Sequence, residues 1–410
     1  MKVARTSLLP LLGLVTAGAL CACGTETAPP VTPETSPDST VSTAGKFDRA
    51  QPADGTDDAT ACDLPAARDR WTGVQTRGAK AGFEGWYMRI QKPGQRDSIA
   101  VIVAFYRREN GAQNEGFVEV IDSRSQQVYR TTSQRIGFSA PGEPLAIKVG
   151  NTVLTDNTLT GRFRSDDGTD VDIDLSFDGC RHWGDPDNGK DRSTMGVPAR
   201  IPFIPLKWHV THLDGAVSGQ LNIGFYETRY DNAAVHFEKN WGKAFPKRWI
   251  WMQANQFDGP VDVAFVGAGG PILDMPLSPE GFMVGLRVGD EFFKWRTQDL
   301  SGFKVTEIDR DNDQLIWRLT ARNGIARLEV EGTANLSDLI PVDVPTPKGL
   351  QIGAAESLKG NLTIRIQRRN KRYQRAVRYH DAEVFQSTSA ALELGGEFLD
   401  DLVGDDAPWQ

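Results

Sequence analysis

The sequence is poor in the residues that bind metals and nucleic acids. It has 4 Cys and 5 His among 410 residues, and no stretch sets four of them at the spacing of a zinc site, so we expect no metal. Asp and Glu number 54 against 46 Lys and Arg, and the formal net charge is −8. Without a basic surplus to neutralise phosphates, this composition argues against a nucleic-acid partner.

Long apolar runs are also missing, and the longest one lies near the start. Residues 8–20 are mostly apolar, but this run is too short to span a membrane as a helix. Two basic residues precede it and small residues follow it, which is the pattern of an export signal over residues 1–22. The sequence LCAC at its end resembles a bacterial lipoprotein signal, with Cys23 as the acylated residue because the small Ala22 precedes it. We therefore expect an exported, membrane-anchored lipoprotein of the cell envelope, and secretion without a lipid is the alternative.

Large apolar side chains are scarce from residue 23 to about residue 65, where Thr, Pro, Ser, Asp and Ala dominate. Such a segment cannot bury enough surface to offset the entropy of ordering, so we predict a disordered tether. Apart from the two cysteines at the signal, only Cys62 and Cys180 remain. In an exported protein this pair predicts a disulfide, and two free buried thiols are the alternative.

Helical periodicity is scarce in the rest of the chain, and short β-runs separated by turn signals take its place. We count eight such runs between residues 84 and 177 and thirteen between residues 208 and 386. Regularly spaced antiparallel strands predict an all-β fold of barrels or sandwiches, which dispose of exposed edges. Turn formers at residues 184–189 place a boundary between an N-terminal β domain, 66–195, and a C-terminal one, 196–400.

The stretch 236–257, HFEKNWGKAFPKRWIWMQANQF, concentrates the unusual residues of the chain. We interpret it as a strand to residue 241, a break, and a second strand from residue 247. Alternation puts His236, Glu238 and Asn240 on one face of the first strand and Lys239 on the other. In the second strand five side chains share a face: Trp249, Trp251, Gln253, Asn255 and Phe257. An acid beside aromatic and amide groups suits a large apolar molecule that must be protonated at one point. A β-hairpin whose Trp residues fill a core is the alternative.

This stretch resembles the signature of the tocopherol cyclase family, in which the pattern EKNWG…FP..W.W.Q.N.F recurs. Three further stretches resemble the family: FEGWY at 83–87, VPTP at 344–347 followed by GL, and ALELGG at 391–396. The resemblance covers the chain from about residue 82 to residue 396. It implies a pair of lipocalin-like antiparallel β-barrel domains. It also implies closure of a chroman ring, in which a phenolic hydroxyl of a prenylated quinol adds across the nearest double bond of its isoprenoid tail, without a redox cofactor or a metal.

The implied reaction requires a proton donor, a sheltered cation and an oxygen nucleophile. Glu238 is our candidate proton donor, since burial disfavours a carboxylate and can hold the group neutral near pH 7. His236 and Asn240 would orient Glu238 or the hydroxyl. Predicted contacts with the apolar substrate come from aromatic and amide side chains: Trp86, Tyr87, Trp241, Trp249, Trp251, Gln253, Asn255 and Phe257.

Two further glutamates lie in the family-like stretches. Glu84 is the second candidate acid, and a structural carboxylate paired with Arg89 or Lys80 is the alternative. We interpret Glu393 as structural. The alternative function for the whole chain is a non-catalytic, lipocalin-type carrier of prenylquinones or other apolar lipids.

Overall fold

The computed structural model describes residues 62, 71–76, 82–107, 114–139, 144–184, 193–273, 275, 278–346, 349–369 and 379–408. The predicted signal peptide at 1–22, the predicted acylation site Cys23 and the predicted tether at 23–65, apart from Cys62, lie outside these described residues. Within the described ranges, every helix is too short or too polar to cross a membrane.

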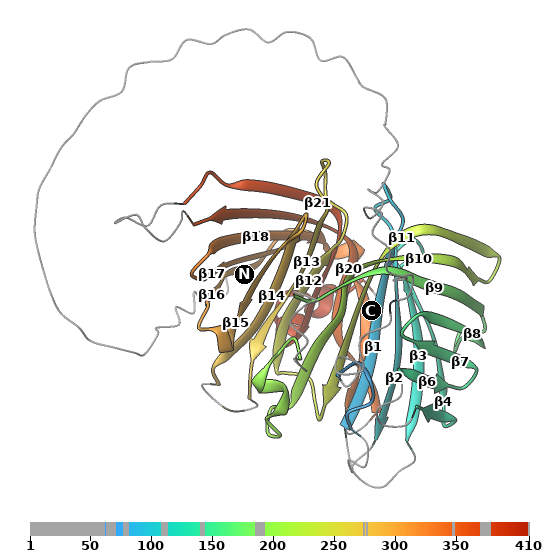
Figure 1. Cartoon of the computed structure of the whole chain (residues 1–410). Helices are drawn as coiled ribbons and strands as arrows, with labels where there is room; N and C mark the ends of the chain where they lie inside the picture. The colour runs from blue at the N-terminus through green and yellow to red at the C-terminus, as the bar shows by residue number, and fades with distance from the viewer. Residues whose placement is uncertain are drawn as a thin grey trace, which may run out of the picture. The chain divides into compact units, whose positions relative to one another are not determined.

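Antiparallel strands form almost all of the described chain, and they are arranged in two sheets (Figure 1). The first sheet has 11 strands in the order β4-β3-β2-β1-β11-β10-β9-β8-β7-β6-β5. Their bounds are β1 Gly82–Gln91, β2 Ser98–Arg107, β3 Glu115–Asp122, β4 Gln127–Ser133, β5 Ile136–Phe138, β6 Ala146–Val149, β7 Thr152–Thr155, β8 Thr158–Arg164, β9 Asp170–His182, β10 Leu206–Ile223 and β11 Tyr226–Gly242.

The second sheet has 10 strands in the order β15-β14-β13-β12-β21-β20-β18-β17-β16, and β19 also pairs with β20. Their bounds are β12 Arg248–Ala254, β13 Val263–Pro271, β14 Glu280–Val288, β15 Glu291–Arg296, β16 Gly302–Asp311, β17 Gln314–Arg322, β18 Ala326–Asn335, β19 Ile340–Thr346, β20 Gly349–Arg368 and β21 Glu383–Gly396. The helical segments are short: η2 Val197–Arg200, η3 Thr297–Asp299, η4 Leu336–Asp338, α2 Glu397–Leu402 and η5 Gly404–Asp406.

Three large apolar cores stabilise the described fold, and one of them holds the two sheets together. One core, which includes Trp86 and Phe105, lies on one face of the first sheet, and a second, which includes Trp295 and Trp317, lies on one face of the second sheet. The third joins side chains from both sheets, such as Trp208 of β10 and Trp251 of β12. Because successive side chains of a strand point to opposite faces of its sheet, one strand can contribute to the core of its own sheet and to the core between the sheets. The predicted all-β fold with two lipocalin-like antiparallel domains is confirmed.

The unusual stretch 236–257 spans the change from one sheet to the other. Its first half ends β11 in the first sheet and its second half forms β12 in the second, so the two runs do not pair as a hairpin. The change of sheet at residues 243–247 comes later in the chain than the domain boundary predicted near residue 195, because β10 and β11 continue the first sheet. Gly242 ends β11 with a φ of 156°. A Cβ there would lie 1.9 Å from the carbonyl oxygen of Pro205, so a side chain has no room.

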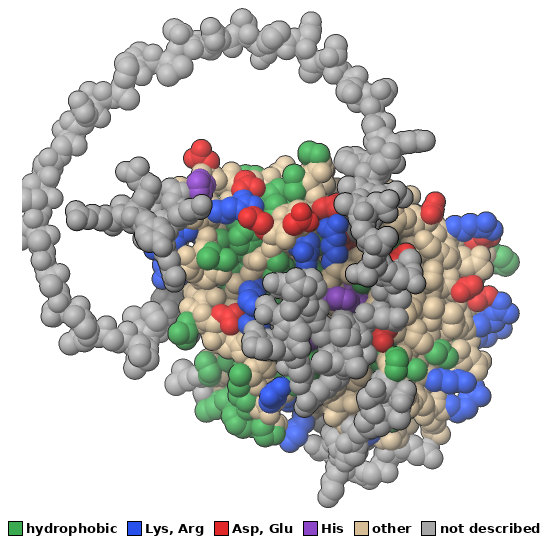
Figure 2. All heavy atoms as spheres, viewed as in Figure 1, with side chains coloured by type: hydrophobic (Ala, Val, Ile, Leu, Met, Phe, Trp, Pro, Cys, Tyr) green, Lys and Arg blue, Asp and Glu red, His purple; other side chains and the backbone are tan. Residues whose placement is uncertain are grey.

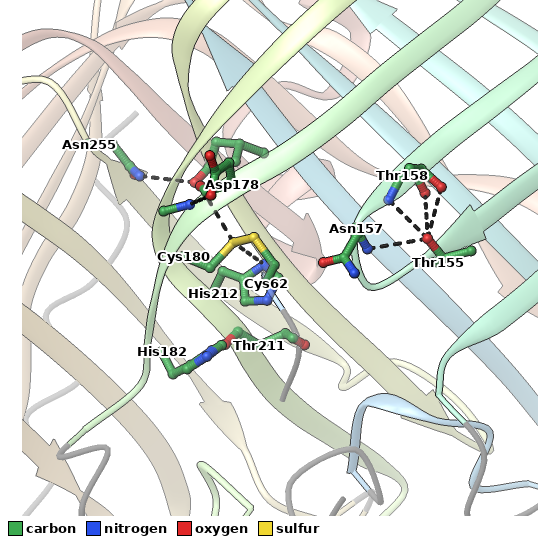
Figure 3. Close-up of a disulfide and its surroundings, with 12 residues drawn as sticks. Cys62, Thr155, Asn157, Thr158, Asp178, Cys180, His182, Thr211, His212 and Asn255 are labelled. Carbon is green, nitrogen blue, oxygen red and sulfur yellow. Dashed lines mark hydrogen bonds between the residues drawn. A yellow bond between two sulfur atoms is a disulfide. The ribbon is translucent and has the colours of Figure 1, made fainter. Parts of the chain in front are cut away.

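A disulfide joins Cys62 to Cys180 on β9, with a sequence separation of 118 residues (Figure 3). Cys62 is buried, so the end of the predicted tether is part of the folded unit. The Sγ of Cys180 lies 3.4 Å from Nδ1 of His212 on β10. Cross-links of this length remove much of the entropy of the unfolded chain, which favours the folded form.

Charged side chains of both signs are interspersed over the face of the molecule in Figure 2. Surface ion pairs among the described residues include those of Arg318 with Glu307 and Glu331. Exposed pairs of this kind contribute little to stability, so the cores carry the fold.

Candidate active site

Two neighbouring strands of the first sheet bring the predicted site residues to the boundary with the second sheet. β1 pairs with β11 so that Tyr87 lies opposite Glu238 and Trp86 lies opposite Lys239. Directly opposite residues in an antiparallel pair project to the same side of the sheet. Tyr87 and Glu238 therefore face the second sheet together, whereas Trp86 and Lys239 face the core of the first sheet.

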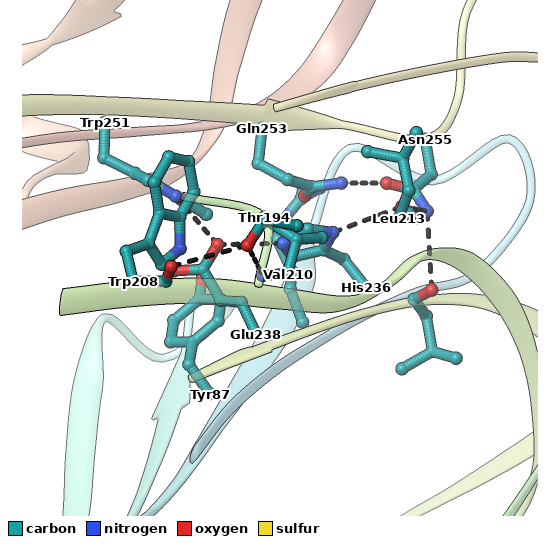
Figure 4. A network of polar contacts seen from close by, with 12 residues as sticks. Tyr87, Thr194, Trp208, Val210, Leu213, His236, Glu238, Trp251, Gln253 and Asn255 are labelled. Carbon is teal, nitrogen blue, oxygen red and sulfur yellow. Dashed lines mark hydrogen bonds and ion pairs between the residues drawn. The ribbon is translucent and has the colours of Figure 1, made fainter. Parts of the chain in front are cut away.

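Glu238 is buried, with an exposed fraction of 4%, and two side chains contact its carboxyl group (Figure 4). Nε1 of Trp251 donates to Oε2 over 3.1 Å, and Nε2 of His236 lies 3.0 Å from the same oxygen. Trp251 belongs to β12, so this contact joins the two sheets. Both contacts fall on Oε2, which leaves Oε1 free of these two side chains.

The tautomer of His236 follows from its second contact. Its Nδ1 lies 3.2 Å from the carbonyl oxygen of Leu213, which can only accept a hydrogen bond. Nδ1 therefore carries a proton, and Nε2 carries one only when His236 is an imidazolium. In the neutral ring Nε2 would accept a hydrogen bond from a protonated Oε2 of Glu238, and in the imidazolium it donates to Oε2. The pair can thus store a proton beside the carboxyl group.

A cavity of about 480 Å³ opens between the two sheets, and Glu238 lies in its wall. This volume falls within the roughly 300–1,000 Å³ of ordinary small-molecule sites. The first sheet contributes side chains such as Phe83 and Tyr87, and the second contributes Trp249, Trp251 and others. Most lining side chains are apolar, and the few polar ones include Asn240 and Glu393. One cavity shared by both sheets therefore holds the predicted acid, three indole rings and the amide of Asn240.

Two further carboxyl groups lie in the second sheet, where Glu393 of β21 is directly opposite Glu356 of β20. Nε1 of Trp249 donates to Oε1 of Glu393, and the hydroxyl of Tyr87 donates to Oε1 of Glu356 over 2.6 Å. Burial and the neighbouring carboxyl of Glu393 raise the pKa of Glu356 to about 8. Burial and the charge of Glu238 raise the pKa of Glu393 to about 7. Burial and Glu356 also raise the pKa of Tyr87.

The ALELGG stretch explains how Trp249 reaches Glu393. Gly395 lies directly opposite Trp249 in the β12–β21 pair. A Cβ on Gly395 would lie 2.1 Å from Cζ2 of Trp249, so any larger residue would displace the indole ring. The glycine therefore allows the ring to lie across β21 with its N–H on the glutamate two residues earlier.

The three predicted substrate contacts that follow Trp251 in the chain lie outside the cavity wall. Gln253 is fully buried and accepts a hydrogen bond from Nη1 of Arg89 over 2.9 Å. Asn255 donates to the carbonyl oxygen of Leu213, the same atom that fixes His236, and to Oδ1 of Asp214. Phe257 packs against the core of the second sheet. The polar residues of this set form a chain behind the cavity, as Figure 4 shows for Gln253 and Asn255, and they position His236 without lining the cavity.

Glu84, Trp86 and Trp241 also lie away from the cavity, in the interior of the first sheet. Glu84 is fully buried and forms an ion pair with Nζ of Lys239 over 2.8 Å. Its partner is thus Lys239 and not Arg89, whereas Lys80 lies outside the described residues, and Glu84 also accepts the backbone N–H groups of residues 75 and 76. The Lys239 ammonium lies over the rings of Trp86 and Trp241. These residues support the fold, because strand alternation turns them from the cavity.

Among the described residues, one cluster of His, Cys and carboxylates has metal-binding spacing: Cys62, Cys180 and His212. The two sulfurs are bonded to each other, so neither is a thiolate that could bind an ion. The cavity described above holds no part of this cluster.

Glu356 is the site residue that sequence reasoning missed, and Glu393 was interpreted as structural. A signal for both was present. Each is a charged residue inside an apolar stretch, AAESL at 354–358 and ALELGG at 391–396. Buried acids are rare unless paired, so an acid in such a run indicates a special site.

Comparison with known proteins agrees with these features. The family model described as "Tocopherol cyclase-like" matches residues 147–396. A chloroplastic tocopherol cyclase of Zea mays is 27% identical over 219 residues, which cover 52% of this chain and 44% of the maize protein. The match thus spans less than half of that relative. A probable chloroplastic tocopherol cyclase of Oryza sativa subsp. japonica is 23% identical over 374 residues, 78% of this chain and 76% of the rice protein. The solved structure of kievitone hydratase from Nectria haematococca is 14% identical, has a TM-score of 0.44, and covers 81% of this chain and 92% of its own.

Proposed function

The chain belongs to the tocopherol cyclase-like family, and on that premise we propose that it cyclises a prenylated quinol to a chromanol. In this reaction a proton adds to the isoprenoid double bond nearest the ring, which leaves a tertiary cation. The phenolic oxygen then bonds to the cationic carbon and loses its proton. The product has the same composition as the substrate, so the reaction is an isomerisation.

The observation that carries the proposal is the position of Glu238. It is a buried acid in the wall of an apolar cavity, with Trp251 and His236 both at Oε2. When His236 is an imidazolium, both side chains donate to Oε2, which stabilises the carboxylate that remains after proton transfer and leaves Oε1 to deliver the proton to the alkene. General acid catalysis of this kind supplies roughly a hundred- to ten-thousandfold of the rate.

The tertiary cation needs nearby groups that stabilise positive charge but do not bond to the cationic carbon. The rings of Trp249 and Trp251 lie in the cavity wall, and Tyr87 packs edge-on against Trp251 with centroids 5.3 Å apart. Aromatic faces attract a cation by about 2 kcal/mol or more when water is excluded. Asn240, also in the wall, could hold the phenolic hydroxyl near the cation.

The surroundings of the cavity support an apolar ligand that comes from a lipid phase. Phe203 lines the cavity and is 70% exposed, and Val197, next to the lining residue Pro198, is 69% exposed. Exposed apolar side chains at the mouth of an apolar cavity lower the cost of ligand transfer from lipid. An acyl group on Cys23 would hold the chain at a membrane of the cell envelope, which mass spectrometry of the N-terminal peptide would test.

The test of this proposal is incubation of the purified protein with prenylated quinols in D2O. Cyclisation should give a chromanol that carries a single, non-exchangeable deuterium on carbon, because the alkene takes its proton from an exchangeable acid. Recovery of unlabelled quinol alone, across several tail lengths, would refute a cyclase that acts on this substrate class.

A non-catalytic carrier of prenylquinones or other apolar lipids is the second candidate. The mostly apolar lining of the cavity favours it. The buried acid argues against it, since a carrier of apolar lipid gains nothing from the cost of burying a carboxyl group. Organic extraction of the protein that yields a stoichiometric, unreacted lipid, together with no turnover, would support the carrier.

A further inference from the structure

Two carboxyl groups in the cavity wall are held in the same way by neighbouring tryptophans. Trp249 and Trp251 stand two residues apart on β12, so their side chains share a face. Trp251 donates its indole N–H to Glu238, and Trp249 donates its indole N–H to Glu393. Both glutamates line the cavity, one from each sheet.

We infer that Glu393 is a second catalytic residue, which accepts the proton of the substrate hydroxyl while Glu238 supplies a proton to the alkene. This inference rests on the proposed cyclisation. It gives the two carboxyl groups of one cavity opposite tasks, as a ring closure that protonates carbon and deprotonates oxygen requires.

The surroundings of the two acids differ in the sense that these tasks need. Glu238 is backed by His236, which can carry a proton and a positive charge. Glu393 lies opposite Glu356, and the Glu393 carboxylate helps to raise the pKa of Glu356 to about 8, so Glu356 keeps its proton when Glu393 loses its own. A cationic neighbour makes a carboxylic acid a better donor, and burial without a cationic neighbour makes a carboxylate a better acceptor.

Glu356 is itself arranged to respond to the charge on Glu393. Its Oε1 accepts the Tyr87 hydroxyl, whereas its Oε2 is buried and has no hydrogen-bond partner among the described residues. The ionisable groups that act on this pair are Glu238 of β11 and Tyr87 and Arg89 of β1. The raised pKa values of Glu393 and Glu356, about 7 and about 8, place both groups where a proton can be taken up and returned near neutral pH.

The proton balance of the cycle closes without another reactant. Glu238 gives a proton to the less substituted alkene carbon, and the π electrons form the new C–H bond. A lone pair of the phenolic oxygen forms the C–O bond at the tertiary carbon, and the oxygen loses its proton to the Glu393 carboxylate. A proton then returns from Glu393 to Glu238, and the protein ends the cycle as it began.

The test compares Glu393→Gln with the wild-type protein over the pH range of activity. We expect kcat to fall by about a hundredfold or more, with KM changed less than about threefold. The wild-type rate should rise with pH through about pH 7 as Glu393 loses its proton, and the variant should lack this rise. A Glu393→Gln protein with the wild-type kcat and the same rise would overturn the inference.

A second variant covers the case in which Glu393→Gln fails to fold. Trp249→Phe keeps a ring in place and removes the indole donor that lowers the pKa of Glu393. Its rise of rate with pH should therefore move to higher pH, and an unmoved rise would overturn the inference. Failure of the proposed function is a separate result, because the wild-type protein would then form no chromanol at all.

Discussion

Trp251 of the second sheet donates its indole N–H to Oε2 of Glu238 in the first sheet, over 3.1 Å. The acid, its donor and His236 thus come from β11 and β12, two strands that are consecutive in the chain but belong to different sheets. The site lies at the contact between the two sheets, and the stretch 236–257 contributes the end of β11 to one sheet and β12 to the other.

Removal of the Trp251 donor should slow the reaction without unfolding the protein. A hydrogen bond to a charged group contributes about 1.5–3 kcal/mol, so Trp251→Phe should lower kcat by roughly ten- to a hundredfold. Trp208→Phe is the matched control, because Trp208 lines the same cavity and its Nε1 has no hydrogen-bond partner among the described residues. Equal kcat values for the two variants would contradict a role for the Trp251 N–H.

The buried ion pair of Glu84 and Lys239 should stabilise the fold without taking part in the chemistry. Both side chains are fully buried, so Lys239→Met would leave an uncompensated carboxylate and lower the free energy of unfolding by about 3–5 kcal/mol. Glu84→Gln combined with Lys239→Met should recover part of this loss. Urea unfolding followed by circular dichroism measures both effects, and a loss below about 1 kcal/mol in Lys239→Met would contradict the buried pair.

Stability should depend on pH through Glu119 of β3, a buried acid outside the cavity. Neither of its carboxyl oxygens has a hydrogen-bond partner among the described residues, and burial raises its pKa to about 8. The folded protein then binds one more proton than the unfolded chain between the usual pKa of a glutamate, 4.5, and about 8. In that window the free energy of unfolding falls as pH rises, by at most about 1.4 kcal/mol per pH unit from this group.

Glu119→Gln removes this dependence, because an amide does not titrate. The variant should gain stability relative to the wild-type protein as pH rises through the window, and the difference should level off above about pH 8. Urea midpoints at about pH 5, 6.5 and 8.5 would measure it. A difference that stays constant over the three pH values would contradict a raised pKa for Glu119.

The fold class and the acid were predictable from the sequence, because both depend on local patterns. β-branched and aromatic runs between turn residues indicated the strands, and alternation separated Glu238 from Lys239. The runs predicted at 208–213 and 216–226 form one long strand, β10, because bulges interrupt its pairing without ending it. Bulges leave no clear mark in the sequence.

The positions of Glu356 and Glu393 next to the site depend on contacts that a sequence does not reveal. Glu356 and Glu393 meet because β20 and β21 pair in a particular register, and Tyr87 reaches Glu356 across the two sheets from 269 residues away. Strand alternation also predicted too many cavity-lining residues on β12. Gln253 shares a face with Trp251, but it does not line the cavity, and its side chain binds Arg89 where a substrate contact was predicted.

The central claim is that the Glu238 carboxyl group donates the proton that starts ring closure. Its most direct test is the initial rate of chromanol formation from a prenylated quinol by Glu238→Gln, with Glu119→Gln as the same change at a buried acid outside the cavity. We predict that Glu238→Gln folds and loses activity by about a hundred- to ten-thousandfold, whereas Glu119→Gln keeps the wild-type rate. A folded Glu238→Gln protein that forms chromanol at the wild-type rate would contradict the claim.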